Sequence, residues 1–357
     1  MSKIVYYLGA GASYGESRTI IQHPGSSEAD EILINSGLPI VNEIASRLRS
    51  FHKYVNGINT TVENNEIEIW RLKFIEVNKE LEDTKQELLK DIAWLHNETI
   101  KHATIDTFAK KLYLSGKTSD YKRLEKVLCL YLVWEQLDHR GDQRYDTFLA
   151  SVLTENGLQL PKEISVISWN YDSQFEMAYS NYTNDQLFVY DKFGAAQRLP
   201  DYGRIFKVNG SASFRETPTP LEIVAGELDK GVALLWYYNH CEIQVDINGF
   251  EQIRPRLSFA WEQGKQANEN MMKAIEETVS DAEVLVVIGY SFPFFNRSVD
   301  REIFGFMDQL ETIYIQDPSA NEIKQNVQNV MSDIQKAQKV EVITKTNYSQ
   351  FFLPPEL

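Results

Sequence analysis

Short apolar runs that end abruptly in polar or glycine-containing clusters constrain the fold of this chain most. The most apolar run is Val-Leu-Val-Val-Ile at 284–288. Similar runs lie at 4–8, 164–168, 204–208, 312–315 and 340–343. Continuous apolar strands that alternate with helical stretches predict a parallel sheet covered by helices on both faces, a Rossmann-like α/β fold.

The first run turns directly into Gly-Ala-Gly-Ala-Ser at 9–13. Glycines at such a turn let the backbone approach a pyrophosphate, and the N–H groups that open the next helix supply donors. The complete G-x-G-x-x-G spacing is not present, because Tyr14 occupies the place of the third glycine. The motif alone therefore leaves two interpretations open, a nucleotide site and an ordinary tight turn.

Other predicted strands also end in polar clusters. These clusters are Trp-Asn-Tyr-Asp at 169–172, Asn-Gly-Ser at 209–211, Gly-Tyr-Ser at 289–291 and Gln-Asp-Pro at 316–318. Any one of them is compatible with a simple turn or cap. Together they favour a ligand site, since ligands of open parallel sheets bind beyond the carboxyl ends of the strands.

Two further segments interrupt this pattern. Between about 63 and 139, apolar residues recur at helical spacing, which predicts an all-helical module that packs as core or serves oligomerisation or partner docking. The polar segment from 14 to 36 is expected to be either a loop that orders over a ligand or a surface insertion without a role. The predicted division is a nucleotide-binding domain at 1–55 and 160–357, with a helical insertion at 56–159.

Composition narrows the classes of function. Of the 357 residues, 43% are hydrophobic and 24% charged, which is typical of a soluble globular protein, and the net charge of −15 disfavours direct binding to nucleic acid or anionic membranes. The two cysteines, Cys129 and Cys241, cannot supply a four-thiolate zinc site. We expect a cytoplasmic protein without signal peptide, membrane span or metal.

Taken in order, the clusters at 9–13, 169–172, 207–211 and 288–291, with Asp300 following, resemble the SIR2-like family. More narrowly, they are similar to the bacterial SIR2-like, NAD-consuming effectors of anti-phage defence. The helical stretch, including Ile-Asp-Thr-Phe at 105–108 and Tyr-Asp-Thr-Phe at 145–148, resembles the elaborations that such effectors carry. The resemblance implies a SIR2-like fold with NAD as substrate.

The resemblance also implies roles for individual residues. Asn170 matches the family's catalytic asparagine, which holds the nicotinamide ribose or a water beside the scissile bond. Three groups of residues match the family's NAD-binding positions. Gly9, Ala10, Gly11 and Ser13 match those around the pyrophosphate and ribose, and Gly289, Tyr290 and Ser291 match those on the adenosine side. Gly210 and Ser211 match the two residues that in the family follow its catalytic histidine.

Three departures from the family pattern bear on the activity. The zinc-binding cysteine quartet of deacylating sirtuins is absent, and Pro39 is followed by Ile40 rather than by Asp-Phe-Arg. Asn209 stands where the family has its histidine, and an amide cannot act as a general base near neutral pH. Asp172 is a candidate for a compensating carboxylate, or alternatively caps the helix that follows it.

Two functions of different class follow from these residues. The first is an NAD+ glycohydrolase that depletes cellular NAD during abortive infection, silent until a co-encoded activator or sensor protein or homo-oligomerisation switches it on. The alternative is a catalytically weak, NAD- or nucleotide-binding subunit that acts as scaffold or sensor in a defence complex. The phosphate turn and Asn170 favour the first, and Asn209 favours the second.

Overall fold

The computed structural model describes most of the chain and divides it into two compact units. The described residues are 2–15, 17–18, 34–35, 38–40, 43–61, 74–138, 142–153, 158–182, 189–191, 204–214, 229–241, 254–262 and 266–357. Unit 1 comprises Met1–Leu38, His139–Gly210 and Ser258–Leu357, and unit 2 comprises Pro39–Asp138 and Ser211–Leu257.

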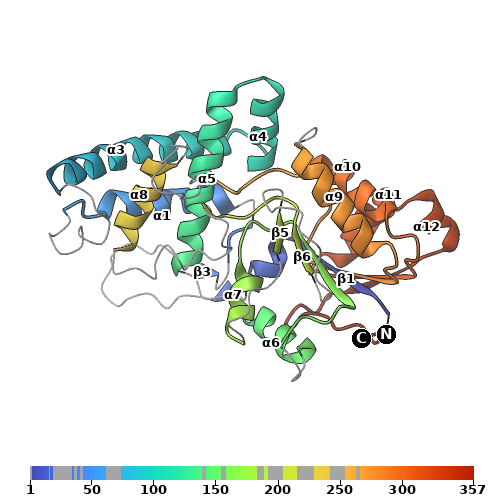
Figure 1. The fold of residues 1–357 in the computed structure, drawn as a ribbon. Coiled ribbons are helices and arrows are strands. Elements are labelled where there is room, and N and C mark those ends of the chain that lie inside the picture. The colour runs from blue at the N-terminus through green and yellow to red at the C-terminus, as the bar shows by residue number, and fades with distance from the viewer. Residues whose placement is uncertain are drawn as a thin grey trace. The chain divides into compact units, whose positions relative to one another are not determined.

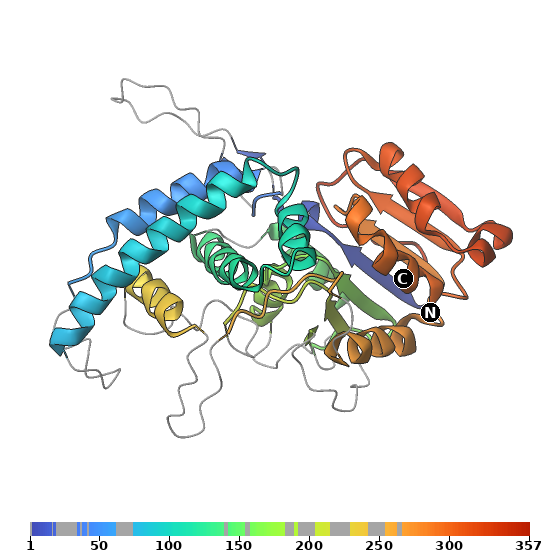
Figure 2. The same cartoon turned by 90° about the horizontal axis from the view of Figure 1, so that it is seen from above.

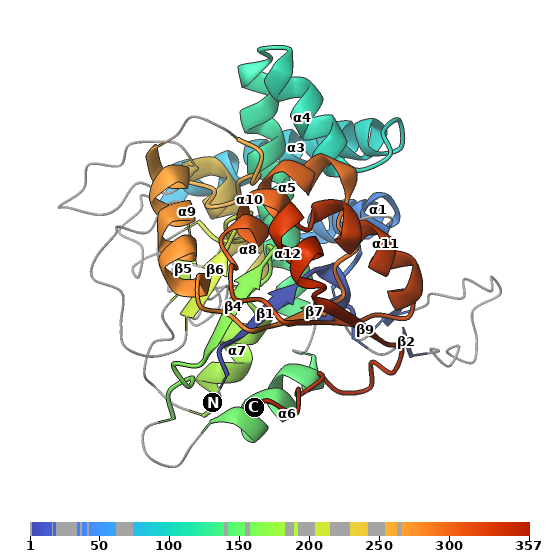
Figure 3. The same ribbon diagram turned by 90° about the vertical axis from the view of Figure 1, so that its right-hand side faces the viewer.

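Unit 1 is built on one parallel sheet of seven strands, which confirms the predicted Rossmann-like α/β architecture. In chain order the strands are β1 (Ile4–Leu8), β4 (Ile164–Ser168), β5 (Val189–Asp191), β6 (Arg204–Lys207), β7 (Val284–Ile288), β8 (Thr312–Gln316) and β9 (Glu341–Lys345). Across the sheet their order is β5-β6-β4-β1-β7-β8-β9, and every pairing is parallel. β1 therefore lies in the middle, between β4 and β7 (Figure 3).

Helices cover both faces of this sheet (Figure 3). Val5 and Tyr7 of β1 face one side, where they join a core with α9 (Gln266–Val279), α10 (Arg297–Gly305) and α11 (Ala320–Val330). Tyr6 and Leu8 face the other side and pack with α6 (Gln143–Val152) and α7 (Gln174–Ser180). Because both faces are buried, the strands read as continuous apolar runs rather than as alternating ones.

The strand ends differ slightly from those predicted. β9 begins at Glu341 instead of Val340, because the preceding helix α12 (Asp333–Gln338) ends with Lys339 in the left-handed conformation, φ 59°. The Val340 N–H donates to the Gln335 carbonyl, 3.2 Å away, so Val340 belongs to the turn. β5 was not predicted, and at three residues it is too short to give a periodic signal.

Unit 2 contains five described helices. They are α1 (Ile44–Gly57), α3 (Phe74–Thr99), α4 (Ile105–Leu114), α5 (Thr118–Asp138) and α8 (Lys230–His240). α1 and α3 lie side by side (Figures 1 and 2). α1 runs from Ile44 to Gly57 because Ile44, Leu48, Phe51 and Val55 form one buried stripe along it.

The segment after the first strand is only partly described. It begins with a short 3-10 helix, Ala10–Ser13, and includes the small antiparallel pair β2 (Ser17–Arg18) and β3 (Ile34–Asn35). The rest of the predicted loop at 14–36 lies largely outside the described residues. Among the helices that are described, none combines the length and apolar character needed to cross a membrane.

Candidate functional site at the carboxyl edge of the sheet

The carboxyl end of β1 lies where the direction of strand addition reverses. The chain adds β4 on one side of β1 and later returns to add β7 on the other side. Ligands of open α/β sheets bind in the crevice outside the strand ends at such a reversal. The loops after β1 and β7, which begin at Gly9 and Gly289, meet at this point.

Glycines make the close approach of these two loops possible. The Gly9 N–H donates to the Ile288 carbonyl and the Gly11 N–H to the Gly289 carbonyl, both at 3.0 Å. A β-carbon on Gly9 would lie 2.5 Å from the Gly289 oxygen, and one on Gly11 would lie 2.8 Å from the Gly289 Cα. Two donors expected for a pyrophosphate are thus used within the fold, and the glycines serve loop packing.

Ser13 joins three polar side chains at the end of this loop. Its hydroxyl donates to Oδ1 of Asp172 at 3.1 Å, accepts from Nδ2 of Asn170 at 3.1 Å, and lies 2.9 Å from the Tyr145 hydroxyl. Burial raises the pKa of the Tyr145 phenol, so Tyr145 is a neutral donor here. The structure therefore brings together three residues that the sequence singled out, Ser13, Asn170 and Asp172.

Asn170 and Asp172 each keep one polar atom outside this network. Among the described residues, no donor contacts Oδ1 of Asn170 or Oδ2 of Asp172. Asp172 also accepts from the N–H of Gln174, the first residue of α7, at 3.1 Å. Both interpretations of Asp172 are thus compatible with its geometry, since one oxygen serves the helix start and the other is available.

Arg144 anchors the loop that carries Ser13, and sequence reasoning missed it. Its guanidinium donates to the carbonyls of Gly11 and Ala12 at 3.1 and 3.2 Å and pairs with the Asp142 carboxylate at 2.5 Å. A planar fork of donors suits such simultaneous contacts. Nothing in the sequence pairs Arg144 or the neighbouring Tyr145 with the distant loop.

A buried ion pair lies next to Asp172. Nζ of Lys207, at the end of β6, donates to the Asp172 carbonyl and lies 3.4 Å from Oε1 of Glu176. Both side chains are buried. Burial raises the pKa of Glu176, and the nearby Lys207 ammonium opposes that rise.

The side chain of Asn209 is occupied by backbone partners. Its Nδ2 donates to the Trp169 carbonyl at 2.9 Å, and its Oδ1 accepts from the Ala260 N–H at 3.0 Å. Asn209 thus connects Trp169, the residue before Asn170, to the segment that begins at Ser258. This arrangement positions the strand ends, and it uses both functional atoms of the amide.

The remaining matched residues lie in different surroundings. Gly210 adopts φ 69° in a turn closed by its N–H on the Lys207 carbonyl. Ser211 belongs to unit 2, where its N–H donates to the Arg256 carbonyl. Ala10 is half-buried, and Ser291 is exposed, with its carbonyl accepting from Asn326 at 3.0 Å.

Tyr290 belongs to a buried aromatic cluster. Its ring stacks on Trp169 with centroids 5.1 Å apart, and its hydroxyl donates to Asp300 at 3.2 Å. Tyr7 donates to the same carboxyl at 2.6 Å. Burial raises the pKa of Asp300 to about 7, although the two phenols and Arg297 act against the rise. A polar network thus lies directly beneath the loop after β7.

Unit 1 also has two hollows. One, of about 580 Å³, is lined by the ends of β8 and β9 and by the residues up to Leu353. The other, of about 550 Å³, lies between α9 and α10 and reaches Val208 and Ala260, next to Asn209. Within the described ranges, no three side chains of His, Cys, Asp or Glu are grouped so that they could hold a metal.

Comparison of the sequence with protein-family models and with curated proteins finds no match.

Proposed function

We propose that the chain is a SIR2-like NAD+ glycohydrolase that cleaves the bond between nicotinamide and ribose. The observation that carries the proposal is the contact of the Ser13 hydroxyl with both Asn170 and Asp172 at the reversal point of the sheet. A parallel sheet with this strand order presents such a cluster where a dinucleotide binds. The choice of NAD as the substrate rests on the similarity of the ordered motifs to SIR2-like effectors.

The reaction needs little covalent assistance from the protein. The C1′–N1 bond breaks, its electron pair returns to the pyridine ring, and nicotinamide leaves as a neutral molecule. A water oxygen bonds to C1′ and gives up its proton, while the sugar passes through an oxocarbenium-like state. The site must hold the ribose, place the water and favour positive charge on the sugar.

The residues of the cluster can divide these tasks. Asn170, fixed by Ser13 through its amide nitrogen, presents Oδ1 to a ribose hydroxyl or a water. Asp172 presents Oδ2, which can accept the proton of the water and favour the cationic sugar. Asn209 stays a positioning residue, because both ends of its amide are engaged.

Access to the cluster suits an activity that is gated. Asn170 and Ser13 are 5% and 1% exposed, so a movement that uncovers more of the cluster would give a dinucleotide fuller access to it. We propose that a co-encoded activator or sensor protein, or homo-oligomerisation, drives this movement, and that NAD depletion then arrests an infected cell. A monomeric chain that consumes NAD at full rate without a partner would contradict gating.

The engaged amide of Asn209 favours one alternative. A SIR2-like chain in which this position only supports the strand ends can be a nucleotide-binding scaffold or sensor with weak catalysis. The two functions differ in one measurable respect, since the scaffold binds NAD without releasing nicotinamide.

Nicotinamide release from NAD+ tests the proposal. The purified chain is assayed alone and with the product of its neighbouring gene. The variants Asn170→Ala and Asn181→Ala are assayed in the same way, and Asn181 is an exposed residue that follows α7. The proposal predicts release that falls about 100-fold or more in Asn170→Ala and stays unchanged in Asn181→Ala. Binding of NAD without release of nicotinamide under either condition would favour the scaffold. If the chain neither binds NAD nor releases nicotinamide, both proposed functions are overturned.

A further inference from the structure

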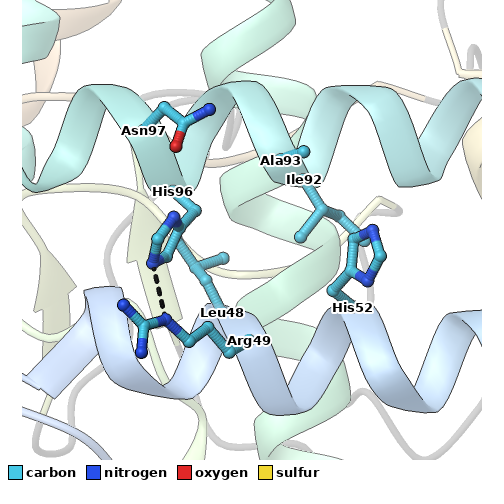
Figure 4. A pocket seen from close by; sticks show the side chains of 7 residues that line it. All are labelled: Leu48, Arg49, His52, Ile92, Ala93, His96 and Asn97. Carbon is cyan, nitrogen blue, oxygen red and sulfur yellow. Dashed lines mark hydrogen bonds between the residues drawn. The ribbon is translucent and has the colours of Figure 1, made fainter.

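A second site, independent of the proposed activity, lies in unit 2 between α1 and α3. Seven residues line a pocket of about 180 Å³: Leu48, Arg49, His52, Ile92, Ala93, His96 and Asn97 (Figure 4). Its floor is apolar, since Leu48 and Ile92 are buried, and its rim includes the exposed Arg49 and Asn97. The pocket therefore has a firm base and an opening to solvent.

Apart from Asn97, the polar side chains that line this pocket are those of one arginine and two histidines. Arg49 and His52 lie one turn apart on α1. His96 of α3 lies beside Arg49 at one end of the pocket, and His52 lies at the other end beside Ile92 (Figure 4). The Arg49 Nε donates to Nε2 of His96 at 3.0 Å, which holds the guanidinium over the pocket. No lining residue is acidic. The chain as a whole is acidic, with 51 Asp and Glu against 36 Lys and Arg, whereas this pocket is lined by one arginine and two histidines and by no acidic residue.

The donors of this group remain available to a ligand. A guanidinium has five N–H donors, and Arg49 uses one of them on His96. Among the residues that the structure describes, no carboxylate pairs with Arg49, and His52 has no hydrogen-bond partner. Planar guanidinium donors next to imidazole N–H groups match the geometry of an oxyanion.

A metal fits the pocket less well. Two histidines are too few, and the described part of the chain contributes no third His, Cys, Asp or Glu ligand here. The Arg49 guanidinium also occupies Nε2 of His96 and would repel a cation. The volume equals about six water molecules at ~30 Å³ each, which is room for one compact anion rather than a whole dinucleotide.

We propose that the α1–α3 pocket binds a phosphoryl group through Arg49, His52 and His96. The group can be inorganic phosphate or the terminal phosphate of a nucleotide whose remainder extends into solvent. Charge-assisted hydrogen bonds from Arg49 supply most of the affinity, and the two imidazoles orient the anion.

Titration of the whole chain with inorganic phosphate, AMP and adenosine, at constant ionic strength, tests this site. The readout is the set of histidine Cε1–H resonances, since the chain has only six histidines. Phosphate should shift the His52 and His96 signals in a saturable way and leave His102 and His240 unchanged. Tighter binding of AMP than of phosphate would identify a nucleotide as the source, and equal binding would identify free phosphate.

Two variants separate a site from general electrostatics. Arg49→Gln should weaken phosphate binding about tenfold or more, because it removes the charged fork. Lys53→Gln removes one exposed positive charge from the same helix outside the lining and should change affinity by less than about twofold. The proposal would be overturned if phosphate caused no saturable shifts, or if the two variants lost affinity for phosphate equally. It would also be overturned if adenosine bound as tightly as AMP.

Discussion

The Gly11 N–H donates to the Gly289 carbonyl at 3.0 Å, and this contact joins the loops after β1 and β7. Gly289 adopts φ 63°, and a β-carbon there would collide with the backbone of Gly11 and Ala12. The two central strands of the sheet can therefore end side by side only if these loop positions carry no side chain. This contact fixes the place of Ser13, which follows two residues after Gly11.

Replacement of Gly289 by alanine is predicted to destabilise unit 1 strongly. The strained φ and the backbone collision together should lower the free energy of unfolding by about 3 kcal/mol or more, measured by urea denaturation. Gly305→Ala is the control, because a β-carbon at this exposed end of α10 meets nothing within 4 Å. The control should be neutral or up to about 1 kcal/mol more stable. Equal stability of the two variants would contradict the proposed packing of the loops.

The sheet could be predicted from the sequence because its strands carry a local signal. Residues 4–8, 164–168 and 284–288 are continuous apolar runs, and the structure has strands at these positions. The reversal of strand order could not be predicted in the same way, because it depends on the pairing of β1 with both β4 and β7. No local pattern records which strands are neighbours.

The candidate site was predictable only in part, for the same reason. Asn170 and Asp172 were found because polar residues follow a strand, which is a local pattern. The hold of Arg144 on Gly11 joins positions 133 residues apart, and the bond between Asn209 and Ala260 joins positions 51 apart. Such contacts arise from the fold as a whole, so the residues involved look ordinary in the sequence.

Stability should depend on the protonation of Asp300. Burial raises its pKa to about 7 from the usual value of 3.8, so the folded chain holds a proton that the unfolded chain releases above pH 4. The stabilising contribution is complete below about pH 4 and is lost as pH rises through 7, with a slope of up to about 1.4 kcal/mol per pH unit.

Urea denaturation at several values between pH 5 and pH 8 measures this dependence. Asp300→Asn keeps the hydrogen-bonding shape without the titration, and its free energy of unfolding should vary less with pH than that of the wild type. Asp308→Asn, at an exposed carboxylate, should follow the wild type. Parallel curves for wild type and Asp300→Asn would mean that Asp300 does not titrate in this range.

Removal of Lys207 should leave an uncompensated carboxylate in the interior. Lys207→Met breaks the pair with Glu176 and the contact with the Asp172 carbonyl, and is expected to cost about 3–5 kcal/mol in the free energy of unfolding. Adding Glu176→Gln should recover at least about 1 kcal/mol, since a neutral amide then replaces the carboxylate that lost its partner.

A surface ion pair provides the comparison for this cycle. Lys101 and Glu98 lie 2.7 Å apart with the lysine 61% exposed, and Lys101→Met should change stability by less than about 1 kcal/mol. A double variant no more stable than Lys207→Met would show that the lost contact with the Asp172 carbonyl, rather than the buried charge, causes the damage.

Nicotinamide release by Ser13→Ala tests most directly whether the Ser13-centred cluster is the active site. The substitution keeps Asn170 and Asp172 but removes the hydroxyl that holds both. The rate under activating conditions should fall about tenfold to a hundredfold, because a misplaced amide no longer holds the ribose. Ser151→Ala, at an exposed hydroxyl of α6, should leave the rate unchanged. A folded Ser13→Ala variant that releases nicotinamide at the wild-type rate would contradict the account.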